Sequence, residues 1–368
     1  MSDAVGAAKA KVALQVEPDY TRPIETRQTA LSWLVFLGVL YTLYFARELV
    51  VPIVLAVLLD FLLKPLVRAL RRVGVPEAAG GAIVVLGLLG SLGFAAFQLA
   101  EPARTLVADA PASIQKATDR LRPVRKPLEK LDRTAHQVER AASEVSDTTT
   151  REVAVKGPTL SSKLLGGVRM FGAGALEVVI LLYFLLASGD LFLQKLIKLL
   201  PQLQDKKTAV AIARETEGAI STYLVTLTLI NAGLALAVAG ALALVGLPNP
   251  LLWGALAGLA EFIPYVGATM MFVLLSLAGL ATFDHLGHAL LVPGVYLAIN
   301  ILQANLVSPL LHGRRLALNP VAIFLGLLLC WWMWGVLGAF IAVPLLATVK
   351  IFCDHLEHLA PVGEFLGK

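Results

Sequence analysis

Long runs of apolar residues, separated by short polar breaks, dominate the chain. A shorter apolar run, 49–63, follows the polar pair Arg47-Glu48. Four further runs have about the ~20 residues that a helix needs to cross a bilayer, namely 29–46, 78–100, 164–187 and 218–246. The pattern predicts an all-α polytopic membrane protein, with its first three spans within residues 29–100.

Two apolar runs do not fit a single upright helix. Residues 247–283 contain one charge, Glu261, and residues 316–349 contain none. Pro264 lacks a backbone donor and Gly267 tolerates unusual dihedral angles, so we expect the first run to break there. The second run is interrupted near Gly335. Each half has the length of a re-entrant segment.

The distribution of basic residues orients the chain. Four cations between Lys64 and Arg72 mark a short cytoplasmic loop, which places the tail 1–28 in the cytoplasm as well. Two topologies remain open: eight simple spans, or about six full spans plus two re-entrant hairpins. The hairpins put Arg314-Arg315 in the cytoplasm, in agreement with the positive-inside rule, and both topologies leave the tail 351–368 there.

A charged segment separates the third and fourth spans. Residues 101–163 contain 12 Lys or Arg and 9 Asp or Glu, together with several prolines. Weakly amphipathic patterns between the prolines predict a small extramembrane helical insertion. Long loops cross the membrane largely regardless of charge, so we expect it on the extracytoplasmic side, either as a solvated connector or as a docking module.

Composition excludes an ordinary soluble enzyme. The 368 residues are 57% hydrophobic and 15% charged, with a mean hydropathy of +0.76. The net charge of +5 is explained by loops that flank the spans, which makes nucleic acid an improbable partner. No nucleotide motif or nucleophile–base spacing is visible, so we expect neither an enzyme nor a cofactor. The repeats Asp284–His288 and Asp354–His358 lie at membrane edges, where we expect polar residues rather than a metal site.

Three carboxamides mark the run that lies between the two broken segments. Asn300 and Gln303 share one helix face, and Asn305 lies further round the helix. Such groups at membrane depth can hydrogen-bond the hydroxyls and carbonyls of a polar solute. The alternative is that they join neighbouring helices.

Glu261 is the most informative single residue. A carboxylate inside the bilayer is costly and commonly functional, which makes it a candidate site for proton or cation coupling. A hydrogen-bonded Glu that fixes the hairpin tip is the alternative. Asp60 lies four residues before Lys64, a spacing that favours a simple interfacial ion pair.

The second half of the chain resembles the autoinducer-2 exporter (AI-2E) family of bacterial membrane proteins. The resemblance covers about residues 160–350 and is carried by five motifs: Gly246-Leu-Pro-Asn-Pro250, Glu261-Phe-Ile-Pro-Tyr-Val-Gly267, Asn305-Leu-Val-Ser-Pro309, Gly313 to Pro320, and Gly335-Val-Leu-Gly-Ala339 running to Pro344. Where the family usually has an asparagine or similar residue before Phe-Ile-Pro, this chain has Glu261, which implies a difference in ion coupling.

The resemblance implies a multi-pass protein of the bacterial inner membrane that forms a homo-oligomer, with a pentamer as the expected form. It implies a secondary transporter that exports a small polar solute such as autoinducer-2, coupled to a proton or sodium gradient. We expect the site at the hairpin tips, where Pro264 and Tyr265 lie, and at the three carboxamides, with Glu261 coupling the ion. Two alternatives stay open: a sodium/proton antiporter without an organic substrate, and a non-transporting membrane scaffold.

Overall fold

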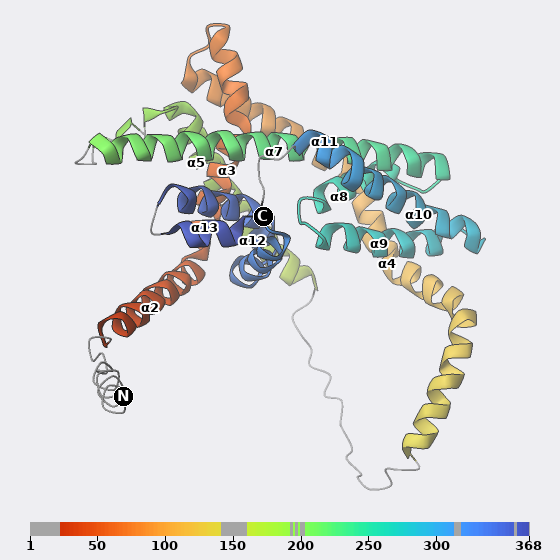
Figure 1. The fold of residues 1–368 in the computed structure, drawn as a ribbon. Helices are drawn as coiled ribbons and strands as arrows, with labels where there is room; N and C mark the ends of the chain where they lie inside the picture. The colour runs from red at the N-terminus through yellow and green to blue at the C-terminus, as the bar shows by residue number, and fades with distance from the viewer. Residues whose placement is uncertain are drawn as a thin grey trace, which may run out of the picture. The chain divides into compact units, whose positions relative to one another are not determined.

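A computed structural model gives the fold of this protein (Figure 1). It describes residues 23–140, 160–191, 203–312, 318–356 and 359–367, with Gln194, Lys195 and Lys198. Several predictions therefore lie outside the described residues, and these concern most of the tail 1–28, the stretch 141–159 of the insertion, and Arg314-Arg315.

The described chain is almost entirely helical, as the apolar runs predicted. Within the described residues, five helices are long and apolar enough to cross a membrane. Three shorter apolar helices accompany them, of which two are 250–260 and 266–282. These lengths confirm the prediction of a polytopic all-α membrane protein.

The first 50 residues form a separate compact unit. Its described part contains helix α2 (Pro23–Phe45) and the start of α3 (Arg47–Arg72). Ala46 forms a turn between the two, and the Arg47 guanidinium lies 5.8 Å from the centre of the Tyr44 ring. The break therefore falls one residue before the predicted polar pair, which begins α3.

Helices α3, α4 (Glu77–Arg140) and α5 (Leu160–Ser188) share one apolar cluster in the second unit. It joins Ala56 of α3, Val85 of α4 and Leu182 of α5. Helix α4 does not end at Glu101, where the charged segment begins, but continues through its prolines to Arg140. The described part of the predicted insertion is therefore helical and continuous with the third span.

Helices α7 (Leu203–Val245) and α8 (Pro250–Ala260) pack closely because small residues lie between them. A Cβ on Gly254 would lie 2.7 Å from the Cβ of Ala239, and a Cβ on Gly258 would lie 2.8 Å from the Cβ of Ala235. Their backbones can approach only because glycine has no side chain. Helices α9 (Val266–Thr282) and α10 (Leu286–Leu302) join α7 and α8 in one buried apolar cluster. Met271 of α9 and Tyr296 of α10 belong to it.

The run 247–283 folds as two antiparallel arms, α8 and α9, which we call the first hairpin. The predicted break is confirmed and spans residues 261–265, because α8 ends at Ala260 and α9 begins at Val266. Gly267 closes the turn: a side chain there would collide with the carbonyl oxygen of Ala260.

The last long helix, α12 (Pro320–His355), also reverses direction. Gly335 takes non-helical angles of φ 65° and ψ −143° inside it, which L side chains rarely adopt. A side chain at Gly338 would collide with the carbonyl of Cys330, and one at Gly326 would collide with Leu346. The two halves of α12 therefore lie against each other as a second hairpin. As in the first hairpin, a glycine lies where a side chain would collide with a backbone carbonyl.

The remaining elements connect these hairpins to the rest of the unit. Helix α10 leads into a short π-helix, η1 (Gln303–Val307), and then into α11 (Ser308–His312). After α12, helix α13 (Ala360–Leu366) brings the end of the chain back to the start of the second hairpin. There the backbone N–H of Asn319 donates to the carbonyl of Leu366 at 2.9 Å.

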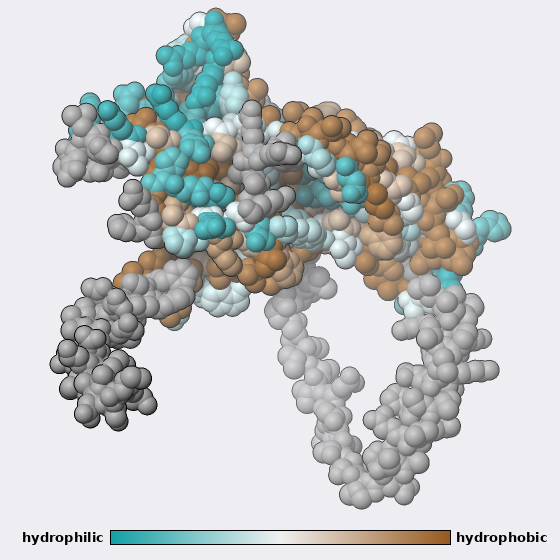
Figure 2. Space-filling view, viewed as in Figure 1, coloured by the Kyte–Doolittle hydropathy of each residue, from teal (hydrophilic) through white to brown (hydrophobic). Residues whose placement is uncertain are grey.

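The surface of the described chain is rich in large apolar side chains. In the view of Figure 2, hydrophobic residues cover most of the part that carries α9, α10 and α11. Leu290, Leu297 and Leu310 on α10 and α11 are 55%, 44% and 78% exposed. Exposure of this kind and extent is expected of helices that face lipid rather than water.

Candidate functional site

The tips of the two hairpins touch each other. The ring of Phe262, just after α8, stacks on the ring of Phe340 in the second arm of α12, with centroids 5.1 Å apart and planes at 28°. Beside it, Ile263 packs on an apolar cluster of the second hairpin that contains Leu327 and Ala339. Two segments about 80 residues apart in the chain therefore meet at their points of reversal.

The first tip has a strained backbone at Tyr265. This residue takes φ 64° and ψ −46°, and the N–H of Val266 donates to the carbonyl of Pro264 at 2.7 Å. The arrangement is a γ-turn with positive φ, which is rare and unfavourable for a residue with a side chain. Pro264 and Tyr265, both predicted site residues, shape this turn, and the side chain of Tyr265 is 59% exposed.

Glu261 lies at the same tip and contacts another of the predicted site residues, Asn300. The side-chain amide of Asn300, on α10, lies 3.3 Å from each carboxylate oxygen of Glu261. No described cation forms an ion pair with Glu261, and Asn300 is its hydrogen-bonding side chain there. One turn away on α10, the Tyr296 hydroxyl lies 3.4 Å from the carbonyl of Ala268. The tip is thus held to α10 by polar contacts on both sides of its turn.

The other two carboxamides do not join this contact. Gln303 opens the π-helix and its amide donates to the Ser308 hydroxyl at 3.2 Å. Asn305 is exposed, and its amide donates to the carbonyl of Ile301 on its own helix at 2.9 Å. The structure therefore brings Asn300 to Glu261, keeps Gln303 one turn away, and turns Asn305 to another face. Single π-helical turns inside α-helices are frequent at functional sites.

Asn231 of α7 was not among the predicted site residues. The residue is 1% exposed, and neither its side-chain nitrogen nor its side-chain oxygen has a hydrogen-bond partner among the described residues. The hydroxyl oxygen of Thr228, three residues earlier on α7, is also buried without a partner. Buried polar atoms without partners are rare in folded proteins. A charge-free asparagine gives no sequence signal of this kind, because burial and partners appear only in the fold.

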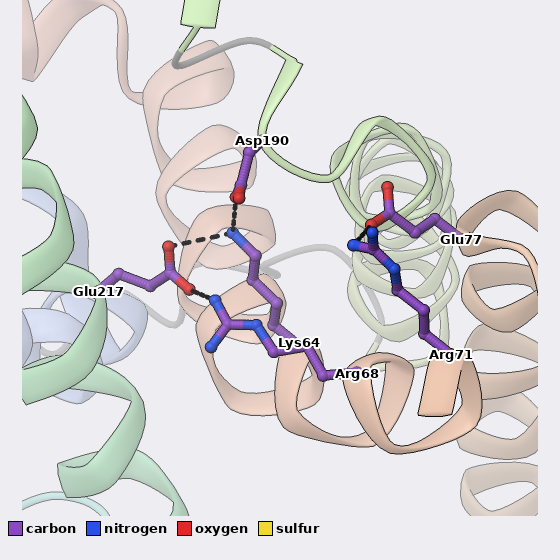
Figure 3. A network of polar contacts seen from close by, with 6 residues as sticks. All are labelled: Lys64, Arg68, Arg71, Glu77, Asp190 and Glu217. Atoms are coloured by element: carbon purple, nitrogen blue, oxygen red, sulfur yellow. Dashed lines mark hydrogen bonds and ion pairs between the residues drawn. The ribbon is translucent and has the colours of Figure 1, made fainter. Parts of the chain in front are cut away.

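A network of charged side chains forms a second polar cluster, shown in Figure 3. The ammonium of Lys64 on α3 lies 3.2 Å from Asp190, which follows α5, and 3.0 Å from Glu217 on α7. Arg68 also pairs with Glu217. Lys64 thus reaches across to two other elements and does not pair with Asp60 as its spacing had predicted. Asp60 is buried at 7% exposure, and its Oδ1 has no described partner.

The two histidine repeats have protein partners at the helix ends. Asp284 pairs with Arg120 of α4 at 2.5 Å, and the Nε2 of His288 lies 2.9 Å from the carbonyl of Val245. At the other repeat, Asp354 pairs with Lys350, and His355 lies 3.2 Å from Glu215. Glu357 and His358 lie outside the described residues. Residues of both repeats therefore contact other helices, α4 and α7.

The sequence is similar to those of several bacterial proteins named as transport proteins. It is 28% identical to the AI-2 transport protein TqsA of Escherichia coli (strain K12) over 327 residues, which are 84% of this chain and 87% of that protein. It is 29% identical over 355 residues to the putative transport protein MT0215 of Mycobacterium tuberculosis, covering 92% of each chain. The putative transport protein YhhT of Escherichia coli (strain K12) is 25% identical over 332 residues.

The family comparison extends the resemblance of the second half to nearly the whole chain. The sequence profile of the AI-2E family transporters matches residues 32–358, from the first predicted span to the end of the second hairpin. The matched region includes both hairpin tips, the Glu261–Asn300 contact and the charged network around Lys64. The chain therefore belongs to the AI-2E family of transporters.

Proposed function

We propose that this chain is a secondary transporter that exports a small polar solute across the bacterial cell membrane, driven by a proton or sodium gradient. The observation that carries the proposal is the contact between Glu261 and Asn300 at a broken helix tip. Irregular backbone at membrane depth is tolerated only where protein buries it or where it lines a watery cavity, and carboxylates at that depth commonly mark the path of a substrate or an ion. The family and the relatives support transport rather than catalysis.

The proposal includes a topology in which both hairpins are re-entrant. In that topology residues 101–140 and the segment after α9 are both extracytoplasmic, and this agrees with the ion pair between Arg120 and Asp284. Eight simple spans would put these two residues on opposite sides of the membrane. The contact of His288 with the end of α7 supports the same choice.

The second hairpin is supported in the same way from the cytoplasmic side. The C-terminal segment is cytoplasmic in either topology, and Asn319 at the start of the hairpin bonds to Leu366 within that segment. Eight simple spans would place the start of α12 outside. The network of Lys64, Asp190 and Glu217 joins segments that are cytoplasmic in both topologies.

We propose that the solute binds to the polar groups between the first tip and α10. The side-chain amides of Asn300 and Gln303 can form hydrogen bonds with hydroxyl and carbonyl groups. The two residues are one turn apart on the same helix face. Autoinducer-2 is the candidate solute, because the name of the relative TqsA gives that molecule as its cargo. Glu261, which holds Asn300, links solute binding to the coupling ion.

The transport step we propose is a movement of the hairpins against α3, α4 and α5. Both tips touch through Phe262 and Phe340, so a shift of one hairpin changes the surface that it offers the other. The π-helix at Gln303–Val307 gives α10 a point at which its backbone can change register. The homo-oligomer implied by the family resemblance remains part of the proposal, with each chain carrying its own site.

Proteoliposomes that contain the purified chain and autoinducer-2 test the proposal. We expect solute movement that depends on a proton or sodium gradient, and Glu261→Gln should change its dependence on pH. Asn305→Ala serves as a control, since that amide bonds only within its own helix. Sodium-driven proton flux without any solute would favour the antiporter alternative. Absence of both fluxes would overturn the proposal.

A further inference from the structure

Beneath the first tip, α7 carries a polar pair that no described side chain satisfies. Asn231 is 1% exposed with both side-chain polar atoms unpartnered, and the hydroxyl oxygen of Thr228 is likewise buried and unpartnered. The two residues are three apart on one helix face. Leaving three such atoms without partners is expensive in a protein interior. Their retention indicates that something else supplies the missing interactions.

The register of the packed helices places this pair beside Glu261. Gly254 of α8 lies against Ala235 and Ala239 of α7, and four residues later Gly258 lies against Asn231 and Ala235. Helices α7 and α8 are therefore antiparallel, and three residues after Gly258, just beyond the end of α8, Glu261 is level with Asn231 and Thr228.

Helix α10 leads to the same level from the other direction. His288, at its start, contacts the carbonyl of Val245 at the end of α7. Twelve residues further along this antiparallel pair, Asn300 is level with the neighbourhood of Asn231. Asn231 also lies on the buried stripe of α7 with Leu234 and Val238, which packs on Ala260 and Tyr296. Three elements thus bring polar groups to one depth.

The first tip adds backbone oxygens to this set. No described backbone N–H donates to the carbonyls of Glu261 or Phe262, because hydrogen bonding stops at Ala260 and resumes at Ile263. Unwound carbonyls at broken membrane helices are suited to coordinating Na⁺. Carboxylate, amide, hydroxyl and carbonyl oxygens are hard ligands of the type that such cations prefer.

We infer that Asn231 and Thr228 join Glu261 and the carbonyls of the first tip in a binding site for a monovalent cation of the sodium class. One carboxylate, with no described cation paired to it, balances one positive charge. The amide oxygen of Asn231 and the hydroxyl of Thr228 then gain the partner that the protein does not provide. The inference rests on the proposed function, because it names the coupling ion and its ligands.

Binding of ²²Na⁺ to the full chain in lipid nanodiscs tests the inference without transport. The wild type should bind sodium saturably, and Asn231→Leu should bind it at least tenfold more weakly. Thr228→Val, which keeps the shape of the side chain, should weaken binding to a lesser degree. Asn305→Leu, at an exposed amide on η1, should bind as the wild type does.

Thermal unfolding in sodium-free choline buffer separates a ligand from a structural residue. If Asn231 serves the ion, Asn231→Leu removes two unsatisfied atoms and leaves the melting temperature unchanged or higher, while the stabilisation by added NaCl is lost. Wild-type affinity in Asn231→Leu would overturn the inference, as would a lower melting temperature without sodium.

Failure of the inference can be told apart from failure of the proposed function. A wild-type chain that exports solute on a proton gradient but binds no sodium would overturn the cation site and leave the transporter. A chain that binds sodium through Asn231 but moves no solute would overturn the proposed export function and leave the cation site.

Discussion

Phe262 and Phe340 stack with their ring centroids 5.1 Å apart, and in doing so they join the tips of two hairpins from distant parts of the chain. The contact fixes the position of Glu261, the immediate neighbour of Phe262, relative to the second hairpin. Because it lies at the points of reversal, the same contact can transmit a movement from one hairpin to the other.

A double-mutant cycle measures this contact. Stacked aromatic pairs contribute about 0.5–1.5 kcal/mol beyond the area that they bury, so Phe262→Ala and Phe340→Ala should be non-additive by about that free energy of unfolding. Chemical unfolding of the purified chain in detergent gives the values. Phe45→Ala, in the separate N-terminal unit, is the control and should add independently to either variant. Strict additivity of the two tip variants would contradict the joined tips.

The glycines that close the hairpins should not accept even one methyl group. Gly267→Ala and Gly338→Ala each drive a Cβ into a backbone carbonyl, of Ala260 and Cys330 respectively. We expect each to cost about 1–3 kcal/mol of unfolding free energy, the range for overpacked positions. Gly240→Ala and Gly294→Ala are matched controls in helices with open space around them, and they should be neutral or slightly stabilising. Equal losses for the two hairpin variants and the two control variants would show that the turns have room for a side chain.

The sequence was sufficient for the spans and for the breaks. A bilayer requires about 20 apolar residues per helix, and runs of 37 and 34 residues with Pro264 or Gly335 inside them had to bend. Composition could not show which tips meet, because Phe262 and Phe340 are ordinary apolar residues in apolar runs. The continuation of α4 past Glu101 was also missed, since charge marks the edge of a membrane but does not end a helix.

The partners of these polar residues could not be predicted from the sequence, because they come from distant parts of the chain. Asn300 and Glu261 were recognised as unusual in an apolar setting, although 39 residues separate them and their contact is tertiary. For Lys64, local spacing predicted Asp60, whereas the fold provides Glu217, 153 residues away. The sequence did not single out Asn231 as a site residue, because its distinction is a lack of partners in the folded chain.

The network in Figure 3 should stabilise the arrangement of α3 against α7. Glu217 pairs with both Lys64 and Arg68 and is only 16% exposed, so Glu217→Gln leaves Arg68 without its described partner and leaves Lys64 with Asp190 alone. We expect a loss of about 1–3 kcal/mol in unfolding free energy, as for hydrogen bonds to charged groups. Asp190→Asn is the matched control: that carboxylate is 62% exposed, and surface pairs contribute about 0–1 kcal/mol. A larger loss for Asp190→Asn would contradict the central place of Glu217.

Asn300 should matter more than the other two carboxamides for transport. Asn300→Ala removes the side chain that holds Glu261, so we expect at least a tenfold fall in solute flux in proteoliposomes. Gln303→Ala should have an intermediate effect, and Asn305→Ala should leave flux unchanged because its amide bonds to Ile301 of its own helix. Comparable losses for Asn300→Ala and Asn305→Ala would show that the Glu261 contact is not the site.

The re-entrant topology of both hairpins is the claim on which the position of the site depends. It is tested most directly by labelling single cysteines from each side of the membrane, in a variant that lacks the two native ones, Cys330 and Cys353. With a membrane-impermeant thiol reagent, Asp284→Cys should react only from the extracytoplasmic side and Arg314→Cys only from the cytoplasm. Labelling of Asp284→Cys from the cytoplasm and of Arg314→Cys from outside would establish eight simple spans and contradict the hairpins.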